Sequence, residues 1–179
     1  MSGTVDSCDV LVVGGGPVGL VLGGLRAQQS VDVRVVERRA QPTGRSRAIG
    51  VHPPGLSCLA QLGIADALVE AGVRVRRGRA LLHGKPLASV DFSSLPGPFD
   101  FVLSIPQSTT ERLLEERLEQ LRPGALMREV EATQFLPADA GVCVGLRRGD
   151  ERWALAAPWV VGCDGRRSSV RASMDVAFH

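Results

Sequence analysis

The sequence predicts an α/β fold in which helices cover a parallel sheet and a small antiparallel meander adjoins that sheet. Two observations lead to this fold class. An apolar run at 10–13, a glycine-rich turn, an apolar helical segment at 17–29 and a strand-like run at 31–37 follow one another. An amphipathic helix is expected at 107–121, ahead of further strand-like runs. Strands and helices that alternate in this way are typical of parallel sheets with crossover helices.

The turn after the first strand carries glycines at the spacing of a Rossmann-like dinucleotide-binding unit. Gly14 permits a tight turn, Gly16 lets the backbone approach a pyrophosphate, and Gly19 lets the helix pack closely on the strand. The helix N-terminus offers N–H groups and a partial positive charge to phosphates. Glu37 ends the second strand, where a carboxylate accepts hydrogen bonds from a ribose diol. The stretch predicts a bound adenine dinucleotide, and a glycine turn that only packs a helix on a sheet is the alternative.

Glu37, the acid at the end of the second strand, does not by itself determine which dinucleotide binds. Glu37 disfavours a 2′-phosphate by charge repulsion, which favours NAD or FAD over NADP. Arg38 and Arg39 follow directly and argue the opposite way if they meet a ligand. Two adjacent arginines are also common as solvated surface charge, so the residues near Glu37 leave the choice of dinucleotide open.

The middle of the chain combines a loop, helices and short strands. Residues 40–55 are expected to form a loop rich in Pro, Gly and Arg. The spacing of apolar residues in 55–71 predicts helix with a break near Gly63. Short alternating runs divided by glycines and prolines predict β structure with long turns in 73–104.

The last third of the chain is predicted to be mostly β structure. Its expected elements are a strand at 125–135, a hairpin of 142–148 with 152–156, and a final buried strand at 159–163. Asp164 and Gly165 follow this last strand and precede a helix start. A carboxylate in that position lies at the ligand crevice of an open α/β sheet.

Composition and charge exclude several classes of function. The 179 residues are 44% hydrophobic with a net charge of +2, which predicts one domain or slightly more and gives no electrostatic case for nucleic acid. Residues 10–25 are apolar but rich in glycine and preceded by acids, so neither a signal peptide nor a membrane span is expected. The cysteines lack metal-ligand spacing, so no metal site is expected, and reduced thiols in a cytoplasmic protein are the simplest interpretation: Cys8, Cys58, Cys143 and Cys163.

Three further segments narrow the choice of dinucleotide cofactor. Arg45 and Arg47 lie in a glycine loop after the second strand and can reach a pyrophosphate as charge-assisted donors. Gln107 opens the amphipathic helix, followed by Glu111 and Arg112. With the glycine turn and the Gly-Cys-Asp-Gly segment at 162–165, these residues resemble the class A FAD-dependent aromatic hydroxylases of the para-hydroxybenzoate hydroxylase type. The match extends over almost the whole chain, and the order and spacing of the motifs are most similar to actinobacterial hydroxylases of aromatic polyketides and phenols.

The resemblance implies a role for each matching position. The turn from Gly14 through Gly16 and Pro17 to Gly19, with the Val18 amide, holds the FAD pyrophosphate. The remaining contacts are Glu37 at the adenosine ribose, Arg38 at the adenine end, Arg47 and Gln107 at the pyrophosphate and ribityl region, and Asp164 at FAD and the reductant.

The resemblance also implies a reaction. NADPH or NADH reduces the flavin, and a flavin C4a-hydroperoxide hydroxylates an aromatic small-molecule substrate. No catalytic residue is nominated, because the cofactor carries the chemistry and the three histidines lack partners.

The resemblance divides the chain into the FAD-binding βαβ unit with its following helix at 1–72, the first piece of a substrate-domain sheet at 73–106, a return to the FAD-binding domain at 107–171, and the start of a substrate domain at 172–179. Most of that substrate sheet and a third FAD motif lie beyond His179 in the family. We therefore expect this chain by itself to be inactive and to hold FAD weakly. A piece of a longer hydroxylase, half of a split enzyme completed by another chain, and a remnant without turnover all fit this expectation.

Two other classes of function stay open. An NAD(P)-dependent dehydrogenase would bind nicotinamide dinucleotide at the glycine turn and no flavin. A non-catalytic dinucleotide-binding module would bind its ligand without consuming oxygen.

Overall fold

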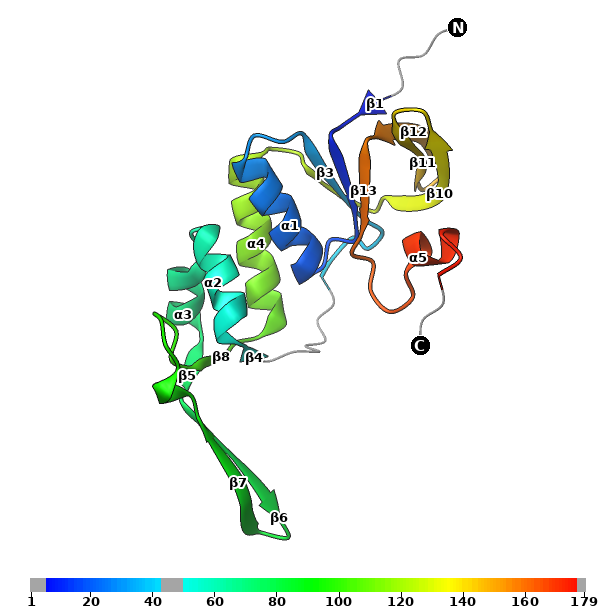
Figure 1. The fold of residues 1–179 in the computed structure, drawn as a ribbon. Coiled ribbons are helices and arrows are strands. Elements are labelled where there is room, and N and C mark those ends of the chain that lie inside the picture. Colours follow the sequence, from blue (N-terminus) through cyan, green and yellow to red (C-terminus); the bar gives the residue numbers. More distant parts are fainter. Residues whose placement is uncertain (1–5, 43–49, 177–179) are drawn as a thin grey trace, which may run out of the picture. The chain divides into compact units, whose positions relative to one another are not determined.

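A computed structural model describes residues 6–42 and 50–176, and these form two compact units (Figure 1). The first unit comprises Met1–Pro42 with Leu114–His179, and the second comprises Thr43–Leu113. Helix α4 (Gln107–Leu121) crosses the division between them. The fourfold division expected from the sequence stays a prediction.

The first unit is built on a parallel sheet of four strands. These are β2 (Val10–Val13), β3 (Val33–Glu37), β9 (Leu126–Arg128) and β13 (Trp159–Gly162), in the order β13-β2-β3-β9. The chain leaves β2 on one side for β3 and returns on the other side as β13. Ligands of open α/β sheets bind at the carboxyl end of the strands at such a switch point. The topology therefore indicates that the carboxyl end of β2 is the candidate ligand-binding position.

Helix α1 (Pro17–Gln28) packs on one face of this sheet at very short range. A Cβ atom on Gly23 would lie 2.7 Å from Val35 Cγ2, so only glycine allows this approach. Ser30 ends the helix with φ 61°, the left-handed position where glycine is usual. The Ser30 and Val31 amides donate to the carbonyls of Ala27 and Arg26, which closes the C-terminus.

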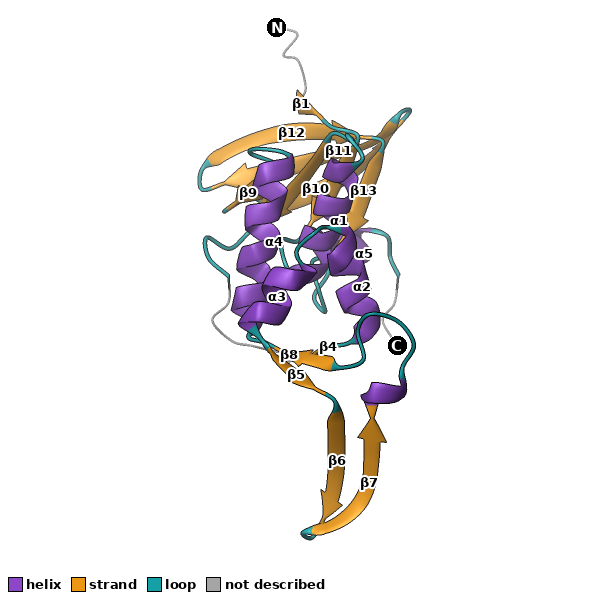
Figure 2. Ribbon diagram, turned by 90° about the vertical axis from the view of Figure 1, so that its left-hand side faces the viewer, coloured by secondary structure: helices purple, strands orange, loops and turns teal. Residues whose placement is uncertain are grey.

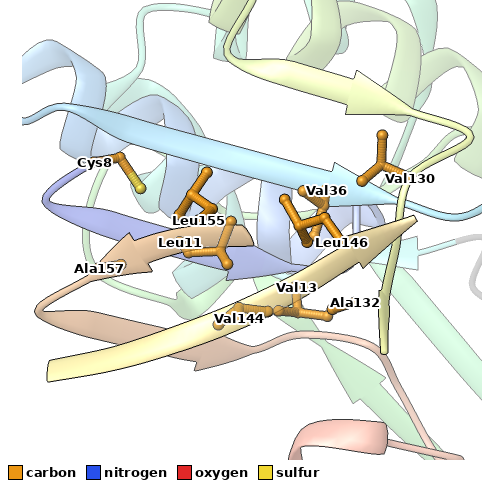
Figure 3. Close-up of a cluster of buried hydrophobic side chains, with 10 residues drawn as sticks. All are labelled: Cys8, Leu11, Val13, Val36, Val130, Ala132, Val144, Leu146, Leu155 and Ala157. Atoms are coloured by element: carbon orange, nitrogen blue, oxygen red, sulfur yellow. The ribbon is translucent and has the colours of Figure 1, made fainter. Parts of the chain in front are cut away.

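A three-stranded antiparallel meander covers the other face of the parallel sheet. It consists of β10 (Glu131–Ala138), β11 (Gly141–Arg148) and β12 (Glu151–Ala157), and β1 (Asp6–Ser7) pairs in parallel with β12. Helix α5 (Ser169–Ser173) packs against β10 and β13. Between the sheets lies a core of buried side chains (Figure 3): Cys8, Leu11, Val13, Val36, Val130, Ala132, Val144, Leu146, Leu155 and Ala157.

The second unit combines two helices with a small antiparallel sheet. Helix α2 (Pro53–Gln61) and helix α3 (Ala65–Ala71) are separated at Gly63, whose φ is 74°. The sheet has the order β4-β8-β5, with bounds Gly50–Val51, Val102–Ser104 and Val73–Val75 respectively. Leu56, Leu59, Leu62 and Leu68 are buried, as their helical spacing predicted.

A separate two-stranded hairpin extends from the second unit (Figure 2). It is formed by β6 (Arg77–Leu82) and β7 (Lys85–Asp91) and is followed by the 3₁₀ turn η1 (Phe92–Ser94). Cross-strand pairing aligns Gly78 with Val90 and Ala80 with Ala88. One face of the ribbon is therefore apolar, and its larger side chains are exposed.

The predicted fold class is confirmed, and three local predictions are wrong. The predicted loop at 40–55 contains β4 and the start of α2. The predicted strand at 125–135 is two strands, β9 and β10, because Glu129 adopts φ 61° and interrupts the extended backbone. The final strand β13 is not buried: it is an edge strand among the described residues, and Trp159 is 70% exposed.

Candidate functional site

The glycine turn lies at the carboxyl end of β2, where packing within the chain explains two of its glycines. Gly14 has φ 112°, and a Cβ there would lie 2.5 Å from the Cys163 carbonyl oxygen. A Cβ on Gly19 would lie 1.9 Å from the Gly14 carbonyl oxygen. Neither position accepts a side chain, so these glycines fix the turn, the start of α1 and the end of β13 against one another.

Gly16 is different, because a Cβ there would meet no atom of residues 6–42 or 50–176 within 4 Å. It is the N-cap residue of α1, and no described side chain caps the helix. Pro17 begins the helix, and the Val18 side chain is 71% exposed. The positive end of the helix dipole and its first-turn amides thus adjoin open space. This arrangement suits an anion that approaches the backbone closely, as predicted for the pyrophosphate.

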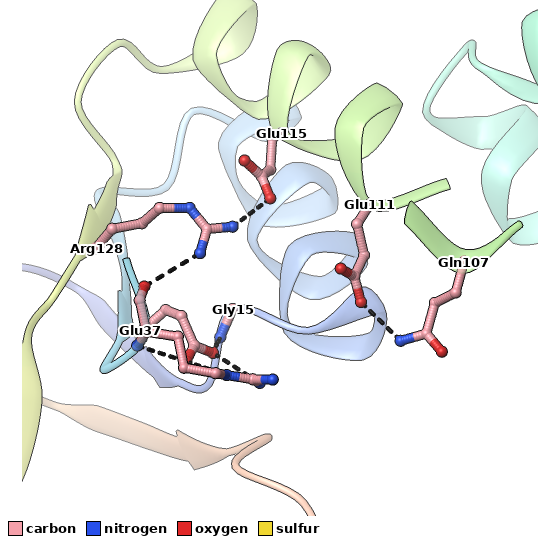
Figure 4. Close-up of polar contacts among 7 residues, drawn as sticks. Gly15, Glu37, Gln107, Glu111, Glu115 and Arg128 are labelled. Atoms are coloured by element: carbon pink, nitrogen blue, oxygen red, sulfur yellow. Dashed lines mark hydrogen bonds and ion pairs between the residues drawn. The ribbon is translucent and has the colours of Figure 1, made fainter. Parts of the chain in front are cut away.

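Glu37 is 5% exposed, and its carboxylate is held by the chain itself (Figure 4). The Gly15 amide donates to Oε2 at 2.9 Å, and the Arg39 amide and Arg39 Nε donate to Oε1 at 2.9 Å each. Burial acts to raise the pKa of Glu37, but the hydrogen bonds from Arg39 and Gly15 outweigh it and lower the pKa. Glu37 is therefore an ionised acceptor beside the glycine turn.

Asp164 follows the neighbouring strand β13 and lies next to the glycine turn. The Cys163 amide donates to the Val13 carbonyl at 2.7 Å, which holds the end of β13 against the end of β2. Asp164 Oδ2 accepts from the Ser169 amide at 2.5 Å and from Ser169 Oγ at 2.9 Å. Burial acts to raise the pKa of Asp164, but hydrogen bonds from Ser168 and Ser169 lower it.

The other carboxylate oxygen of Asp164 is unsatisfied. Asp164 Oδ1 is buried and has no hydrogen-bond partner among the described residues. A buried polar atom without a partner is costly, and it indicates a position where a ligand donor or water is required.

The structure shows less about the three remaining predicted site residues, Gln107, Arg38 and Arg47. Gln107 belongs to the second unit, where its Nε2 donates to Glu111 Oε1 at 2.7 Å (Figure 4). Arg38 is exposed in a depression of about 420 Å³ beyond the end of β3, and Arg47 lies outside the described residues. The roles predicted for Gln107, Arg38 and Arg47 at FAD stay predictions.

Sequence reasoning missed two side chains that bind predicted site residues. Arg39 was weighed as solvated charge, but it binds the Glu37 carboxylate through backbone and side chain. Glu111 has no predicted role on the amphipathic helix, but it is 5% exposed and accepts from Gln107. The spacing of four residues between Gln107 and Glu111 is a signal that was available, because side chains four apart on a helix are neighbours.

The comparison with known families agrees with this geometry. A family described as "FAD binding domain" matches residues 7–179. The chain belongs to this family, the FAD-binding domain of the class A aromatic and polyketide monooxygenases. Both the family and the fold expected from the motifs are confirmed.

Individual relatives share the same region. The chain is 39% identical over 168 residues to a 6-methylpretetramide 4-monooxygenase of Streptomyces rimosus, covering 93% of this chain and 30% of that protein. It is 41% identical over 171 residues to a rifampicin monooxygenase of Streptomyces venezuelae, covering 95% of this chain and 34% of that protein. The chain thus spans about a third of the length of these curated relatives.

Solved structures show the same architecture. An anhydrotetracycline hydroxylase of Streptomyces rimosus matches with a TM-score of 0.86 at 31% identity, over 97% of this chain and 34% of that one. A structure described as the Diels-Alderase of pyrroindomycin biosynthesis matches with a TM-score of 0.78 at 33% identity, over 97% of this chain and 35% of that one. Helices of residues 6–42 and 50–176 are all too short or too polar to cross a bilayer.

Proposed function

We propose that this chain is the FAD-binding part of an NAD(P)H-dependent flavoprotein monooxygenase that hydroxylates an aromatic substrate. The observation that carries the proposal is the set of groups at one sheet switch point. An uncapped helix N-terminus, the ionised carboxylate of Glu37 and the unsatisfied Oδ1 of Asp164 all lie around the glycine turn. This donor and acceptor set fits an adenine dinucleotide of the kind that the family binds.

Each group has a separate task in this proposal. The backbone from Gly14 to Gly19 receives the pyrophosphate, because Gly16 leaves the approach open. Glu37 accepts the adenosine ribose diol, and Asp164 Oδ1 accepts a donor from the cofactor or from water bound beside it. Arg38, Arg47 and Gln107 keep the roles that the family resemblance implies. Bound FAD supplies the redox chemistry and oxygen activation, while the chain binds and orients it.

The reductant in this proposal is NADPH or NADH, and it does not bind at the glycine turn. Glu37 repels a 2′-phosphate at the ribose site, so that site favours FAD. The substrate class follows from the names of the relatives, several of which are monooxygenases named for polyketide or phenolic substrates. An aromatic small molecule is therefore the proposed substrate, and a further polypeptide supplied by another chain is a proposed partner.

A competition titration tests the cofactor. FAD binding is followed by flavin fluorescence, and NAD is then added to displace it. We expect FAD to bind with a lower Kd than NAD, and Glu37→Ala to weaken FAD binding by roughly 1.5–3 kcal/mol, because a charged acceptor is lost. Preferential binding of NAD would favour a dehydrogenase instead. An unchanged FAD affinity in Glu37→Ala would remove Glu37 from the site.

A second candidate is a flavin-binding protein without oxygenase activity. The similarity to a structure described as a Diels-Alderase favours it, because that name states a reaction that needs no oxygen. Oxygen consumption separates the candidates. A monooxygenase consumes O₂ and NAD(P)H when an aromatic substrate and the rest of the enzyme are supplied, whereas the second candidate retains FAD and consumes neither.

A further inference from the structure

The acceptor sites of Glu37 are filled by two different kinds of donor. A carboxylate offers about four lone-pair positions. The backbone amides of Gly15 and Arg39 take one position on each oxygen. The Arg39 guanidinium takes the other two, with Nε on Oε1 at 2.9 Å and Nη2 on Oε2 at 3.5 Å. The backbone donors are fixed by the turn, whereas the guanidinium is on a side chain 48% exposed to solvent.

A ribose diol presents two O–H donors and so needs two acceptor positions. The two that the guanidinium occupies are the ones left after the backbone amides. We propose that Arg39 is a latch that occupies the ribose-binding side of Glu37 in the free chain and must be displaced when a dinucleotide binds. This inference rests on the proposed function, because it takes Glu37 as the ribose acceptor.

The surroundings of Arg39 offer its side chain a second position. Arg39 lines the depression of about 420 Å³ whose walls include Glu129 and Glu131. Glu131 is paired with Arg147 at 2.5 Å, and Glu129 brings a second carboxylate to the same depression. A displaced guanidinium thus moves from the Glu37 carboxylate toward the acidic residues that line the same depression. The latch therefore has two positions, one on Glu37 and one in the depression.

The latch makes a specific energetic prediction. Dinucleotide binding must break the interaction between the guanidinium and Glu37. In the wild-type chain, the free energy of breaking this interaction therefore offsets part of the binding free energy gained from the ribose contact. Among the described residues, removing the guanidinium leaves Glu37 held by the Gly15 and Arg39 amides, with two acceptor positions unfilled. Arg39→Ala should therefore bind a ribose diol more tightly than the wild type, whereas Glu37→Gln should bind it less tightly.

The test uses ADP as the probe, because it carries the pyrophosphate and an intact ribose diol, and 2′-deoxy-ADP as its matched control. Calorimetric titration of the wild type and Arg39→Ala gives the Kd of each. We expect Arg39→Ala to bind ADP about three- to thirtyfold more tightly, the range spanned by a screened ion pair and a charge-assisted hydrogen bond. The gain should shrink markedly for 2′-deoxy-ADP, which a change in the fold alone would not produce.

Two further variants separate the latch from general effects. Arg79→Ala removes one positive charge from the exposed β6–β7 hairpin and should leave the ADP Kd unchanged. In a Glu37→Gln background, Arg39→Ala should give no gain, because the competition has been removed.

The outcomes distinguish this inference from the proposed function. Equal or weaker ADP binding by Arg39→Ala, including no measurable binding, overturns the latch. If Glu37→Gln weakens ADP binding while Arg39→Ala does not strengthen it, the ribose contact stands and only the latch fails. If Glu37→Gln leaves the ADP Kd unchanged, the ribose contact itself fails.

Discussion

At the residue scale, the glycines of the turn after β2 are required for different reasons, and substitution by alanine distinguishes them. Gly14 is required by a φ of 112° and because a Cβ there would clash with Cys163, whereas a Cβ on Gly16 would meet no atom of the described residues within 4 Å. We predict that Gly14→Ala lowers the free energy of unfolding by about 1–3 kcal/mol, the cost of a side chain in a sparsely populated backbone region. Gly16→Ala should keep the wild-type stability but weaken FAD binding.

Urea unfolding and an FAD titration on both variants check this pair. A large loss of stability in Gly16→Ala would mean that this glycine serves the fold. Wild-type FAD binding by Gly16→Ala would mean that no ligand approaches the backbone there.

Glu37 also links stability to pH. Its pKa in the folded chain lies below its ordinary value of 4.5. The stability it contributes is therefore fully present above the ordinary pKa and is lost as the pH falls through the lower pKa of the folded chain. We predict that the free energy of unfolding falls below about pH 4.5 and falls less steeply in Glu37→Gln. Parallel slopes for the two proteins in urea titrations across this range would contradict the link.

At the element scale, the sequence predicted regular elements well and irregular backbone poorly. The predicted bounds of α4 agree with the structure, because the leucine spacing of 107–121 and the Pro123-Gly124 pair after it are both local signals. The split between β9 and β10 depends on Glu129 at positive φ, which no glycine announces. The exposure of β13 depends on its place at a sheet edge among the described strands, which is a tertiary property.

The β6–β7 hairpin is the element least supported by the rest of the described chain. Leu81 and Val90 are 60% and 54% exposed, and a two-stranded ribbon alone is marginally stable. We predict that Leu81→Thr with Val90→Thr lowers the fluorescence of a hydrophobic dye and changes the free energy of unfolding by less than ~0.5 kcal/mol. The buried control Leu155→Ala should cost roughly 2–5 kcal/mol. A similar cost in the hairpin variant would show that these two side chains are covered in solution.

At the scale of the whole molecule, the residues predicted to contact FAD are divided between the two compact units. The glycine turn, Glu37 and Asp164 belong to the first unit, and Gln107 belongs to the second. Sequence motifs pointed to these residues as expected cofactor contacts because such contacts lie at strand ends and helix starts, where local patterns are strong. The motifs did not reveal that Arg39 donates hydrogen bonds to the Glu37 carboxylate. A pairing between residues two apart in the chain leaves no periodic pattern in the sequence.

Because the predicted site residues are divided between the two units, we predict that ADP and FAD slow amide hydrogen exchange in different peptides. ADP carries only the groups assigned to the first unit, so it should slow exchange in peptides around Gly15–Gly19 and leave the start of α4 unchanged. FAD adds the ribityl chain, so it should also slow exchange in peptides that contain Gln107. In Gln107→Ala the additional protection by FAD should disappear while the protection shared with ADP remains. FAD protection that is confined to the first unit in the wild type would remove Gln107 from the site and leave the adenosine end intact, because the two contacts are read from separate peptides.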